Sequence, residues 1–341
     1  MMLSQVDVFK SMVKNTFSKV TYLADETVDW HSVLSESHLA SSEYLVLTIH
    51  YHEAYLLSAK DVSFVIYDNN KPIAVWPLTL YEVENVTRLQ SNCKDIIPPI
   101  FVANTSNKTI KKIYQQCFSL LKKFSLKDNV TLKICYSPMI DVLWQRIFSP
   151  VIVDINYQQY LIADIRGDIT EIKKTFRKSY RSLINKGKKL WQPQLHKYMS
   201  DSLLKQFRLF HIRVSGKETR SLSTWKIQQK MVNNQEAFCI TLHDEDHKLI
   251  AIGLFNISPL QVSYSVGVYD RDLFDLPLGH VIQFEAIQYM KALNVERYFL
   301  GNRYHLFEQK KPTEKEHSIG FFKEGFSSGI HIEANAHLAF D

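Results

Sequence analysis

Residues 65–78 read VIYDNNKPIAVWPL, and residues 242–255 read LHDEDHKLIAIGLF. Each stretch has two apolar runs joined by a polar turn, which is the pattern of a β-hairpin. The motif K-x-I-A begins at Lys71 in the first stretch and at Lys248 in the second, 177 residues later. This offset is about half of the 341-residue chain, so the sequence predicts an internal duplication.

A helix pattern and a short strand pattern follow each hairpin. Residues 108–124 and 278–293 have apolar side chains at helical spacing, and each segment is followed by Asn-Val and then by LKICY or RYFLG. A strand that follows such a helix pairs in parallel with an earlier strand. The sequence therefore predicts an α/β protein of two modules, each a mixed twisted sheet flanked by helices. They are assigned to residues 1–160 and 161–341, with the boundary near residues 155–168.

The composition is that of a folded protein. Hydrophobic residues make up 45% of the chain and charged residues 22%, which argues against an intrinsically disordered chain. The four cysteines have no C-x-x-C spacing, which excludes zinc ribbons and favours reduced thiols. The sequence lacks a signal-peptide pattern and any run of about 18 apolar residues, so we expect a cytoplasmic protein.

Near the N-terminus, four apolar residues lie at helical spacing: Phe9, Val13, Phe17 and Val20. We expect this helix to pack on its own module. A transient contact with a membrane surface is the alternative.

Three segments of the second half resemble one known family. They are a basic segment at 177–189 (RKSYRSLINKGKK), a helix and strand at 280–302 (HVIQFEAIQYMKALNVERYFLGN) and the stretch 320–330 (GFFKEGFSSGI). This succession is similar to that of the Fem-type aminoacyltransferases and their acetyltransferase-like relatives. Such proteins carry two tandem modules of the GCN5-related N-acetyltransferase (GNAT) type. The resemblance implies two tandem GNAT-like modules here, with the active site in the second.

The resemblance also implies a reaction. An acyl or aminoacyl group would move from an activated donor, acyl-CoA or aminoacyl-tRNA, to an amine of a cell-envelope precursor such as an amino sugar or a peptidoglycan intermediate. It implies no tightly bound cofactor, an acceptor that is a small molecule or is linked to a lipid or nucleotide, and tRNA as a partner if the donor is charged tRNA. The glycine-rich R/Q-x-x-G-x-G/A loop of acetyl-CoA enzymes is absent, which leaves the donor open.

Lys323 lies in the sequence F-K-E-G-F, and the resemblance assigns this lysine to the reacting centre. Acyl transfer to an amine builds negative charge on the former carbonyl oxygen, and a fixed ammonium group stabilises that charge. The alternative is a lysine on a half-buried strand, bracketed by the core side chains of Phe322 and Phe326.

The positive charge of the chain is concentrated in residues 171–190, which contain eight basic residues and one acid, Glu171. If this segment is one helix, several cations share a face. We expect Arg177 and Arg181 to bind phosphate groups of the donor. The alternative is a solvated helix face.

A second anion site is predicted where a helix begins, at Leu278, Gly279 and His280. The first N–H groups of a helix have no partner within the helix and favour a pyrophosphate group. Gly279 allows the ligand to approach the backbone closely.

The acceptor site is predicted from polar residues at strand ends and in one segment, 211–229, which reads as a loop between helices. The residues expected to orient the acceptor are His211, Arg220, Trp225, Tyr269 and Asn302. The alternative for the segment is a surface connection that Trp225 anchors to the core. Three residues are candidates for the general base, namely His211, His280 and Asp270.

A rival function belongs to another class. In this reading the protein is a non-catalytic RNA-binding or scaffolding protein that uses the basic residues of 173–189. Two weaker patterns are His50, His52 and Glu53 as metal ligands on one strand face, and Cys93 as a nucleophile. We expect no metal site, and the loop reading of Cys93 is favoured.

Overall fold

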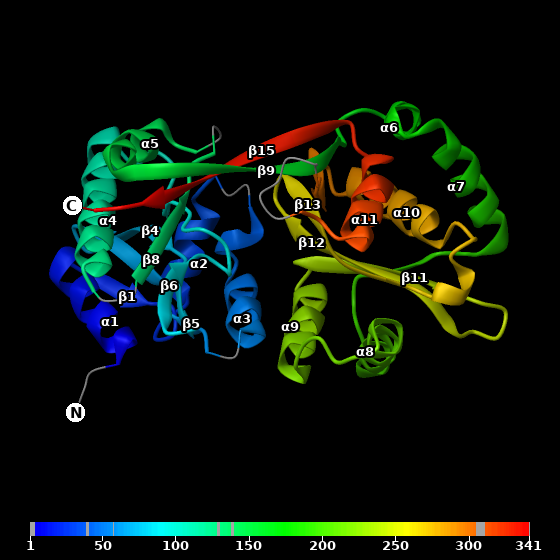
Figure 1. Cartoon of the computed structure of the whole chain (residues 1–341), viewed down its shortest axis with the longest axis horizontal. Coiled ribbons are helices and arrows are strands. Elements are labelled where there is room, and N and C mark those ends of the chain that lie inside the picture. The colour runs from blue at the N-terminus through cyan, green and yellow to red at the C-terminus, as the bar shows by residue number, and fades with distance from the viewer. Residues whose placement is uncertain are drawn as a thin grey trace. The chain divides into compact units, whose positions relative to one another are not determined.

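The computed structural model describes residues 4–38, 41–56, 58–127, 130–137, 140–304 and 311–340 (Figure 1). The chain divides into two compact units. Unit 1 consists of Met1–Leu39, Glu43–Gln158 and Glu333–Asp341, and unit 2 of Ala40–Ser42 and Gln159–Ile332. Strand β9 (Ile152–Asp164) carries the chain from unit 1 into unit 2, and β15 (Gly329–Leu338) returns it to unit 1. The division predicted from the sequence, into residues 1–160 and 161–341, does not include the return of Glu333–Asp341 to unit 1.

Unit 2 is built on one mixed sheet with the strand order β10-β11-β12-β13-β14-β9. Its other strands are β10 (Gln194–His196), β11 (Ala237–His243), β12 (Leu249–Ser258), β13 (Gln261–Tyr269) and β14 (Arg297–Asn302). The neighbours are antiparallel except β13 and β14. These two are parallel because helix α10 (Leu278–Ala292) carries the chain back between them.

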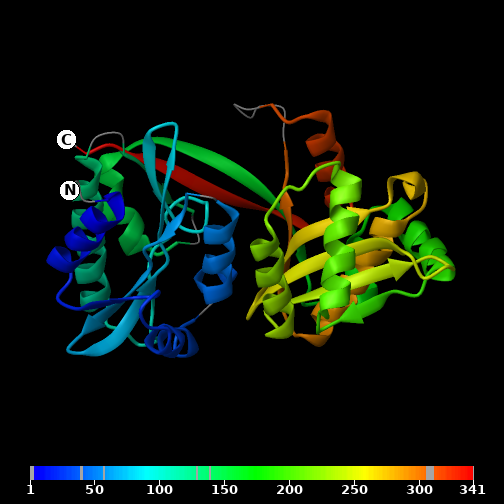
Figure 2. The ribbon, with the colours of Figure 1, turned by 90° about the horizontal axis from the view of Figure 1, so that it is seen from below.

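Helices cover both faces of this sheet (Figures 1 and 2). Helix α10 packs on one face with α7 (Lys178–Leu190) beside it, while α8 (Asp201–Ser215) and α9 (Leu222–Asn233) pack on the other. Strands β11 and β12 are buried along almost their whole length. Their near-continuous apolar runs follow from being covered on both faces. The remaining helices of unit 2 are α6 (Ile169–Thr175), η3 (Arg271–Leu273) and α11 (Glu314–Glu324).

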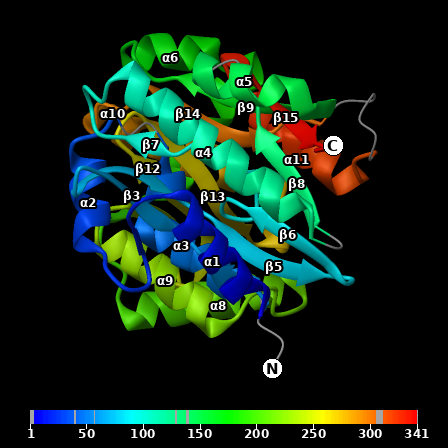
Figure 3. The same ribbon diagram turned by 90° about the vertical axis from the view of Figure 1, so that its left-hand side faces the viewer.

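Unit 1 contains a four-stranded sheet, β1-β3-β4-β7, and a second set of paired strands in the order β15-β8-β6-β5-β2. The strands are β1 (Val20–Tyr22), β2 (Lys60–Asp61), β3 (Phe64–Asp68), β4 (Lys71–Trp76), β5 (Thr79–Val83), β6 (Val86–Gln90), β7 (Ile100–Phe101) and β8 (Val130–Cys135). The helices are α1 (Gln5–Thr16), α2 (Val28–Ser35), η1 (Ser42–Tyr44), α3 (Val46–Tyr55), α4 (Asn107–Ser125), α5 (Val142–Phe148) and η2 (Ser149–Val151). Helices α1 and α4, seen in Figure 3, pack through Phe9 and Phe124, whose ring centres are 5.0 Å apart.

The predicted duplication is visible in the element order. The hairpins are β3-β4 and β11-β12, the amphipathic helices are α4 and α10, and each helix joins a parallel pair of strands, β6 with β8 and β13 with β14. Each unit thus has antiparallel strands, a crossover helix and a parallel strand, which is the GNAT-like succession. The predicted fold class is confirmed.

The two parallel pairs differ in one respect. In unit 1, β6 pairs with β8 only from Thr87 to Leu89, but the chain then returns to β8 at Ile96. The N–H of Ile96 donates to the carbonyl oxygen of Lys133 (2.8 Å), and the N–H of Cys135 donates to that of Ile96 (2.8 Å). The edge of β8 is therefore filled in unit 1. Cys93 lies in the tight turn that makes this return.

Two readings of unit 1 are corrected by the structure. The side chains of Phe9 and Val13 are fully buried and that of Phe17 is nearly so, and therefore these side chains are not available to a membrane surface. His50 and His52 lie on helix α3 rather than on a strand, so their spacing of two residues places them on different faces. None of the helices in the described residues is both long and apolar enough to span a bilayer.

Candidate active site

The parallel strands β13 and β14 separate part-way along their length. They pair only from Gln261 to Ser263 on β13, opposite Arg297 to Phe299 on β14. Just beyond this point each strand has a register shift against its other neighbour, between Tyr264 and Val266 on β13 and between Phe299 and Gly301 on β14. Such bulges leave one residue unpaired and bend the strand. The two strands therefore part and leave backbone groups on both sides without a ladder partner.

The amine of Lys323 lies at this separation. Its Nζ atom is 5.4 Å from the ring centre of Tyr264, the first residue of β13 beyond the paired segment. It also lies against Gly301, where an added Cβ would be 2.6 Å from Nζ. Gly301 has φ +112°, a conformation that other residues rarely adopt, so its backbone requires glycine, and an added Cβ would displace the amine.

Lys323 has no hydrogen bond or ion pair with any residue that the structure describes. Burial lowers the pKa of its amine to about 8. A buried ammonium without a counter-charge is costly, because removal from water disfavours the charged form. The described residues therefore leave this charge uncompensated.

The F-K-E-G-F element is the last turn of helix α11 and its C-terminal end, not a strand. The alternative reading of Lys323 as a strand residue is therefore wrong. Phe322 and Phe326 are four residues apart, and both contact the ring of Tyr180 on α7, at centroid distances of 6.0 and 4.9 Å. A Cβ at Gly325 would lie 2.1 Å from the same ring. The two phenylalanines and the glycine thus hold α11 on α7, while Lys323 reaches Tyr264.

Arg177 ties the end of α11 to the start of α7. Its Nη1 donates to the hydroxyl of Tyr180 (3.1 Å), which donates to the carbonyl oxygen of Phe322 (3.1 Å). Its Nη2 donates to the carbonyl oxygen of Phe321 (3.1 Å), and the guanidinium carbon lies 3.8 Å from the centre of the Phe321 ring. These bonds satisfy carbonyl groups that a helix end leaves free. Arg177 is thus first a cap of α11, with its remaining N–H groups left for a ligand.

The basic segment is not a single helix. Phe176 and Arg177 have extended backbones and separate α6 from α7, so Lys174 does not share a helical face with Lys178 and Arg181. Lys178 and Arg181 lie in the first two turns of α7 and have no ion-pair partner in the described part of the chain. At the far end of α7, Lys188 pairs with Glu285 at 2.8 Å.

The first turn of α10 provides the second group of predicted residues. Leu278 is buried, and the N–H groups of Gly279 and His280 have no acceptor among the described residues. A Cβ at Gly279 would lie 2.9 Å from Phe322, and the His280 ring lies edge-on to Tyr180 at 4.4 Å. Burial, together with Arg177, lowers the pKa of His280 to about 4, so the imidazole is neutral at pH 7.

The starts of α7 and α10 therefore both lie next to the last turn of α11. The side chains that join them are Tyr180, His280 and Phe322. Helix N-termini carry partial positive charge and free N–H groups. These contacts bring Arg177 and the first turn of α10 together on the α7 and α10 side of the sheet, whereas Arg181 makes none of them.

His211, Arg220 and Trp225 lie on the other side of the sheet. The predicted loop is shorter than expected, because α8 continues to Ser215 and α9 begins at Leu222. Trp225 is 1% exposed, which favours the alternative that it anchors the connection. The His211 ring lies 5.3 Å from Trp225, its Nδ1 is buried without a hydrogen-bond partner, and burial lowers its pKa.

Tyr269 connects these two sides. Its hydroxyl is 2.6 Å from that of Tyr264, the ring under Lys323. The next residue, Asp270, accepts a hydrogen bond from Arg213 of α8 (3.1 Å) and lies 3.8 Å from Lys248. Asp270 is thus held in ion pairs with Arg213 and Lys248.

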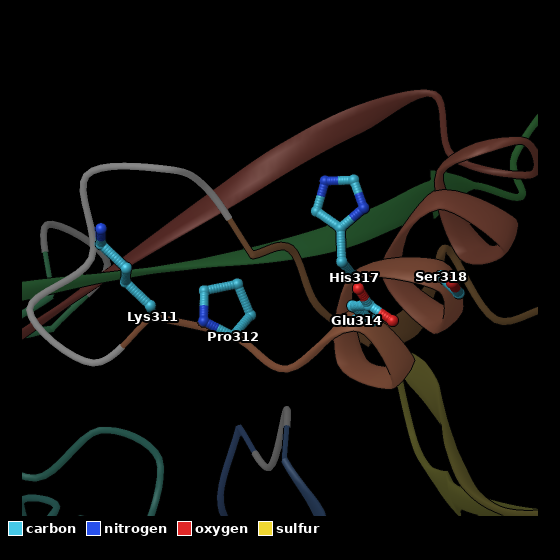
Figure 4. Close-up of a pocket in the computed structure, with 5 residues that line it drawn as sticks. All are labelled: Lys311, Pro312, Glu314, His317 and Ser318. Atoms are coloured by element: carbon cyan, nitrogen blue, oxygen red, sulfur yellow. The ribbon is translucent and has the colours of Figure 1, made fainter.

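Asn302, the exposed last residue of β14, pairs with Tyr160 of β9. A hollow of about 620 Å³ lies beside the segment that leads into α11 and beside the first turns of that helix (Figure 4). Lys311 and Pro312 line it from the segment, and Glu314, His317 and Ser318 line it from the helix.

Three residues of the candidate site were not predicted from the sequence. Tyr264 and Tyr180 look like ordinary aromatic residues of a strand and a helix, and only their contacts with Lys323 and with Phe322 distinguish them. Gly301 could have been predicted, since a glycine at the end of the strand RYFLGN indicates a bulge or a close approach of another group to the backbone.

The sequence matches no protein-family model and no curated protein. Many solved structures are similar to the chain. The crystal structure of FemX matches with a TM-score of 0.62 and 12% identity over 99% of this chain and 97% of that chain. The chain has the Fem-type fold of two tandem GNAT-like modules.

Two further solved structures match over similar lengths. L-PGS from Bacillus licheniformis matches with a TM-score of 0.57 and 12% identity over 91% of each chain. A conserved protein of unknown function from Bacteroides thetaiotaomicron matches with a TM-score of 0.58 and 9% identity over 99% of this chain and 98% of that chain. At these identities the likeness concerns the fold alone.

Proposed function

We propose that the protein is an N-acyltransferase that moves an acyl or aminoacyl group from a phosphate-bearing donor to an amine of a cell-envelope precursor. The observation that carries this proposal is the buried amine of Lys323, which has no counter-charge among the described residues and lies where β13 and β14 part. Acyl transfer is accelerated by a fixed hydrogen-bond donor or positive group at the position of the oxyanion, and a buried ammonium is both.

The chemistry assigned to the site is attack of the acceptor nitrogen on the donor carbonyl carbon. A C–N bond forms, and the carbonyl oxygen takes the negative charge of the tetrahedral intermediate, which the Lys323 ammonium stabilises. The C–S bond of a thioester or the C–O bond of an aminoacyl ester then breaks. The leaving thiolate or alkoxide takes a proton, and the nitrogen loses one. Gly301 and Tyr264 hold the ammonium in position and exclude water from one side.

The donor is assigned to the α7 and α10 side of the sheet. The free N–H groups of Gly279 and His280 and the unpaired cations of Lys178 and Arg181 are the groups that bind phosphate oxygens. Arg177 contributes through the N–H groups that the cap of α11 leaves free. Both CoA and the acceptor end of a tRNA carry the phosphates that this arrangement needs.

The acceptor is assigned to the α8 side, where it reaches the reacting centre through the separation of β13 and β14. His211 is the candidate base, because its imidazole has a lowered pKa and a free Nδ1 atom. Asn302, Arg220 and Tyr269 are proposed to orient the acceptor. The cell-envelope acceptor comes from the similarity to FemX and from the Fem-type motifs of the sequence.

The test is a donor screen followed by a transfer assay. The melting temperature is measured with acyl-CoAs, aminoacyl-tRNAs, uncharged tRNA and nucleotide sugars, because a ligand that binds the folded state raises it. The donor that stabilises the protein is then incubated with amino-sugar and peptidoglycan precursors, and the products are weighed by mass spectrometry. We expect the product to gain the mass of the acyl or aminoacyl group.

The rival function predicts a different result. A non-catalytic RNA-binding protein would bind charged and uncharged tRNA equally, with a steep dependence on salt, and no thioester would stabilise it. That outcome, together with the absence of transfer from each donor, would overturn the proposal.

A further inference from the structure

Unit 1 contains a polar cavity of about 290 Å³. The polar side chains that line it are Arg88, Gln90, Asp95, Thr131, Lys133 and His337. Cavities that hold small organic ligands begin at about this size, so the space suits a ligand of only a few heavy atoms.

The cavity lies where the chain closes the edge of β8. Arg88 on β6 is directly opposite Thr131 on β8, and His337 on β15 is directly opposite Lys133. Asp95 enters from the segment that returns to β8, one residue before the paired Ile96. These strands are the unit 1 counterparts of β13 and β14, so the cavity occupies the place in unit 1 that corresponds to the open separation in unit 2.

Two acceptor groups in this cavity lack donors. The Oε1 atom of Gln90 is buried and has no hydrogen-bond partner. The carboxyl group of Asp95 has no hydrogen bond or ion pair with any described residue, and burial raises its pKa to about 6. A buried acceptor such as Gln90 Oε1 is normally satisfied, so a donor is missing beside it, whereas the Asp95 carboxyl group is only partly buried.

The cavity also has donors without an anion. Neither Arg88 nor Lys133 forms an ion pair in the described part of the chain; the one hydrogen bond of the Arg88 side chain goes to the hydroxyl of Tyr81 at 3.5 Å. Burial, together with Lys133, lowers the pKa of His337, so its imidazole is neutral at pH 7. The site thus has two cations and the carboxyl group of Asp95, which interacts electrostatically with Lys133 and with a second acid, Glu333.

We propose that this cavity binds a free amino acid, with its carboxylate on Arg88 and Lys133 and its ammonium group on Asp95 and the Gln90 carbonyl. A phosphate group would face repulsion from Asp95, and a metal cation would face repulsion from Arg88 and Lys133. A zwitterion of small size is the one ligand class that satisfies both sets of groups. This site is separate from Lys323 and does not rest on the proposed function.

The probes are glycine and L-alanine, with acetate and methylammonium as the two halves of glycine. Binding is followed by ¹³C-methyl NMR on the intact protein, through the signal of Leu89, which lines the cavity. The Leu300 signal in unit 2 serves as the internal control. We expect saturable shifts of Leu89 with both amino acids, and at least tenfold weaker binding of acetate and of methylammonium.

The variants are Arg88→Gln and Asp95→Asn, with Lys133→Gln as a third in case one of these does not fold. Each is expected to weaken glycine binding about tenfold or more, as the loss of a charge-assisted hydrogen bond requires. Lys123→Gln, an exposed cation of α4, and Lys323→Met are expected to leave it unchanged. The proposal is overturned if neither amino acid shifts Leu89 saturably, if acetate binds as tightly as glycine, or if the folded cavity variants bind glycine as the wild type does.

Discussion

The Nζ atom of Lys323 lies 5.4 Å from the centre of the Tyr264 ring, directly after the point where β13 and β14 stop pairing. An aromatic face attracts a cation but cannot neutralise it as a carboxylate would. The charge on this amine is therefore left for a group that arrives during the reaction. The contact with Tyr264 thus places the Lys323 amine where β13 and β14 separate, which is where the proposed acyl transfer takes place.

Replacement of Lys323 by methionine is expected to stabilise the protein while it removes activity. In the folded state the amine has a pKa of about 8, against 10.5 for an exposed lysine, so burial of the charge costs about 1 to 3 kcal/mol at pH 7 after allowance for partial exposure. We expect kcat/KM to fall about 100-fold or more, as the loss of one oxyanion donor does. Urea unfolding and transfer assays measure the two effects.

The pH dependence of stability checks the same charge. Because the unfolded chain binds more protons than the folded chain between pH 8 and 10.5, the Lys323 contribution makes stability rise over this range. The rise should be smaller in Lys323→Met. If Lys323→Met keeps activity within about threefold, it loses less than about 0.7 kcal/mol of transition-state stabilisation. Lys323 would then not act at the reacting centre.

The pH dependence of the reaction distinguishes two roles of Lys323. An ammonium that stabilises an oxyanion must be protonated, so kcat/KM is expected to decline above pH 8. If the neutral amine were a general base, kcat/KM would instead increase through the same pH. A pH–rate profile of the wild-type protein with a saturating acceptor provides the measurement.

Gly301→Ala is expected to disrupt the site from the strand side. The new Cβ would lie 2.6 Å from Nζ of Lys323, and φ +112° is unfavourable for alanine. We expect a loss of about 1 to 3 kcal/mol in stability and a loss of activity, because the amine must move. Gly216→Ala is the matched control: it has φ +75° but no atom within 4 Å, so it should lose stability and keep activity.

Tyr180→Phe tests the attachment of α11 to α7. The phenol accepts from Arg177 and donates to the carbonyl oxygen of Phe322, so its removal breaks both hydrogen bonds. The expected loss in the free energy of unfolding is about 1 to 3 kcal/mol. Thermal unfolding measures it, with Tyr157→Phe as a control at a 62% exposed phenol. Equal stabilities of the two variants would contradict the assigned role of Tyr180.

The double variant Lys178→Gln, Arg181→Gln tests the donor side. Loss of two phosphate-binding cations should weaken donor binding and reduce its dependence on salt, because fewer counterions are released. Titrations at two salt concentrations measure both effects. The control is Lys122→Gln, Lys123→Gln on α4, which removes the same charge from unit 1. If both double variants bind the donor alike, the assignment of Lys178 and Arg181 is wrong.

Much of the fold could be predicted because it repeats. The K-x-I-A hairpins and the amphipathic helices depend on local periodicity, and the structure has them at the expected positions. Local periodicity carries no information on Phe176 and Arg177, where two extended residues break a segment rich in helix-forming residues. The side-chain contacts of Arg177 and Tyr180 with α11 determine that break, and they join residues more than 140 positions apart.

The candidate site was harder to predict than the fold for the same reason. Lys323 was identified through its motif, but the motif was ambiguous between a strand and a helix. Neither Tyr264 nor Gly301 is near Lys323 in the sequence, and the bulges that separate β13 from β14 arise from pairing registers. His211 and Arg177 were expected to act in one site, yet they lie on helices that cover different faces of the sheet.

Strand β15 has a consequence for the order in which the chain folds as it is made. Its residues Asn335, Ala336 and His337 pair with β8 of unit 1, although all of unit 2 precedes them in the chain. A ribosome therefore completes unit 2 before it supplies the strand that covers this edge of unit 1. The half of the protein that is synthesised first is the half that finishes folding last, with an unpaired strand edge until then.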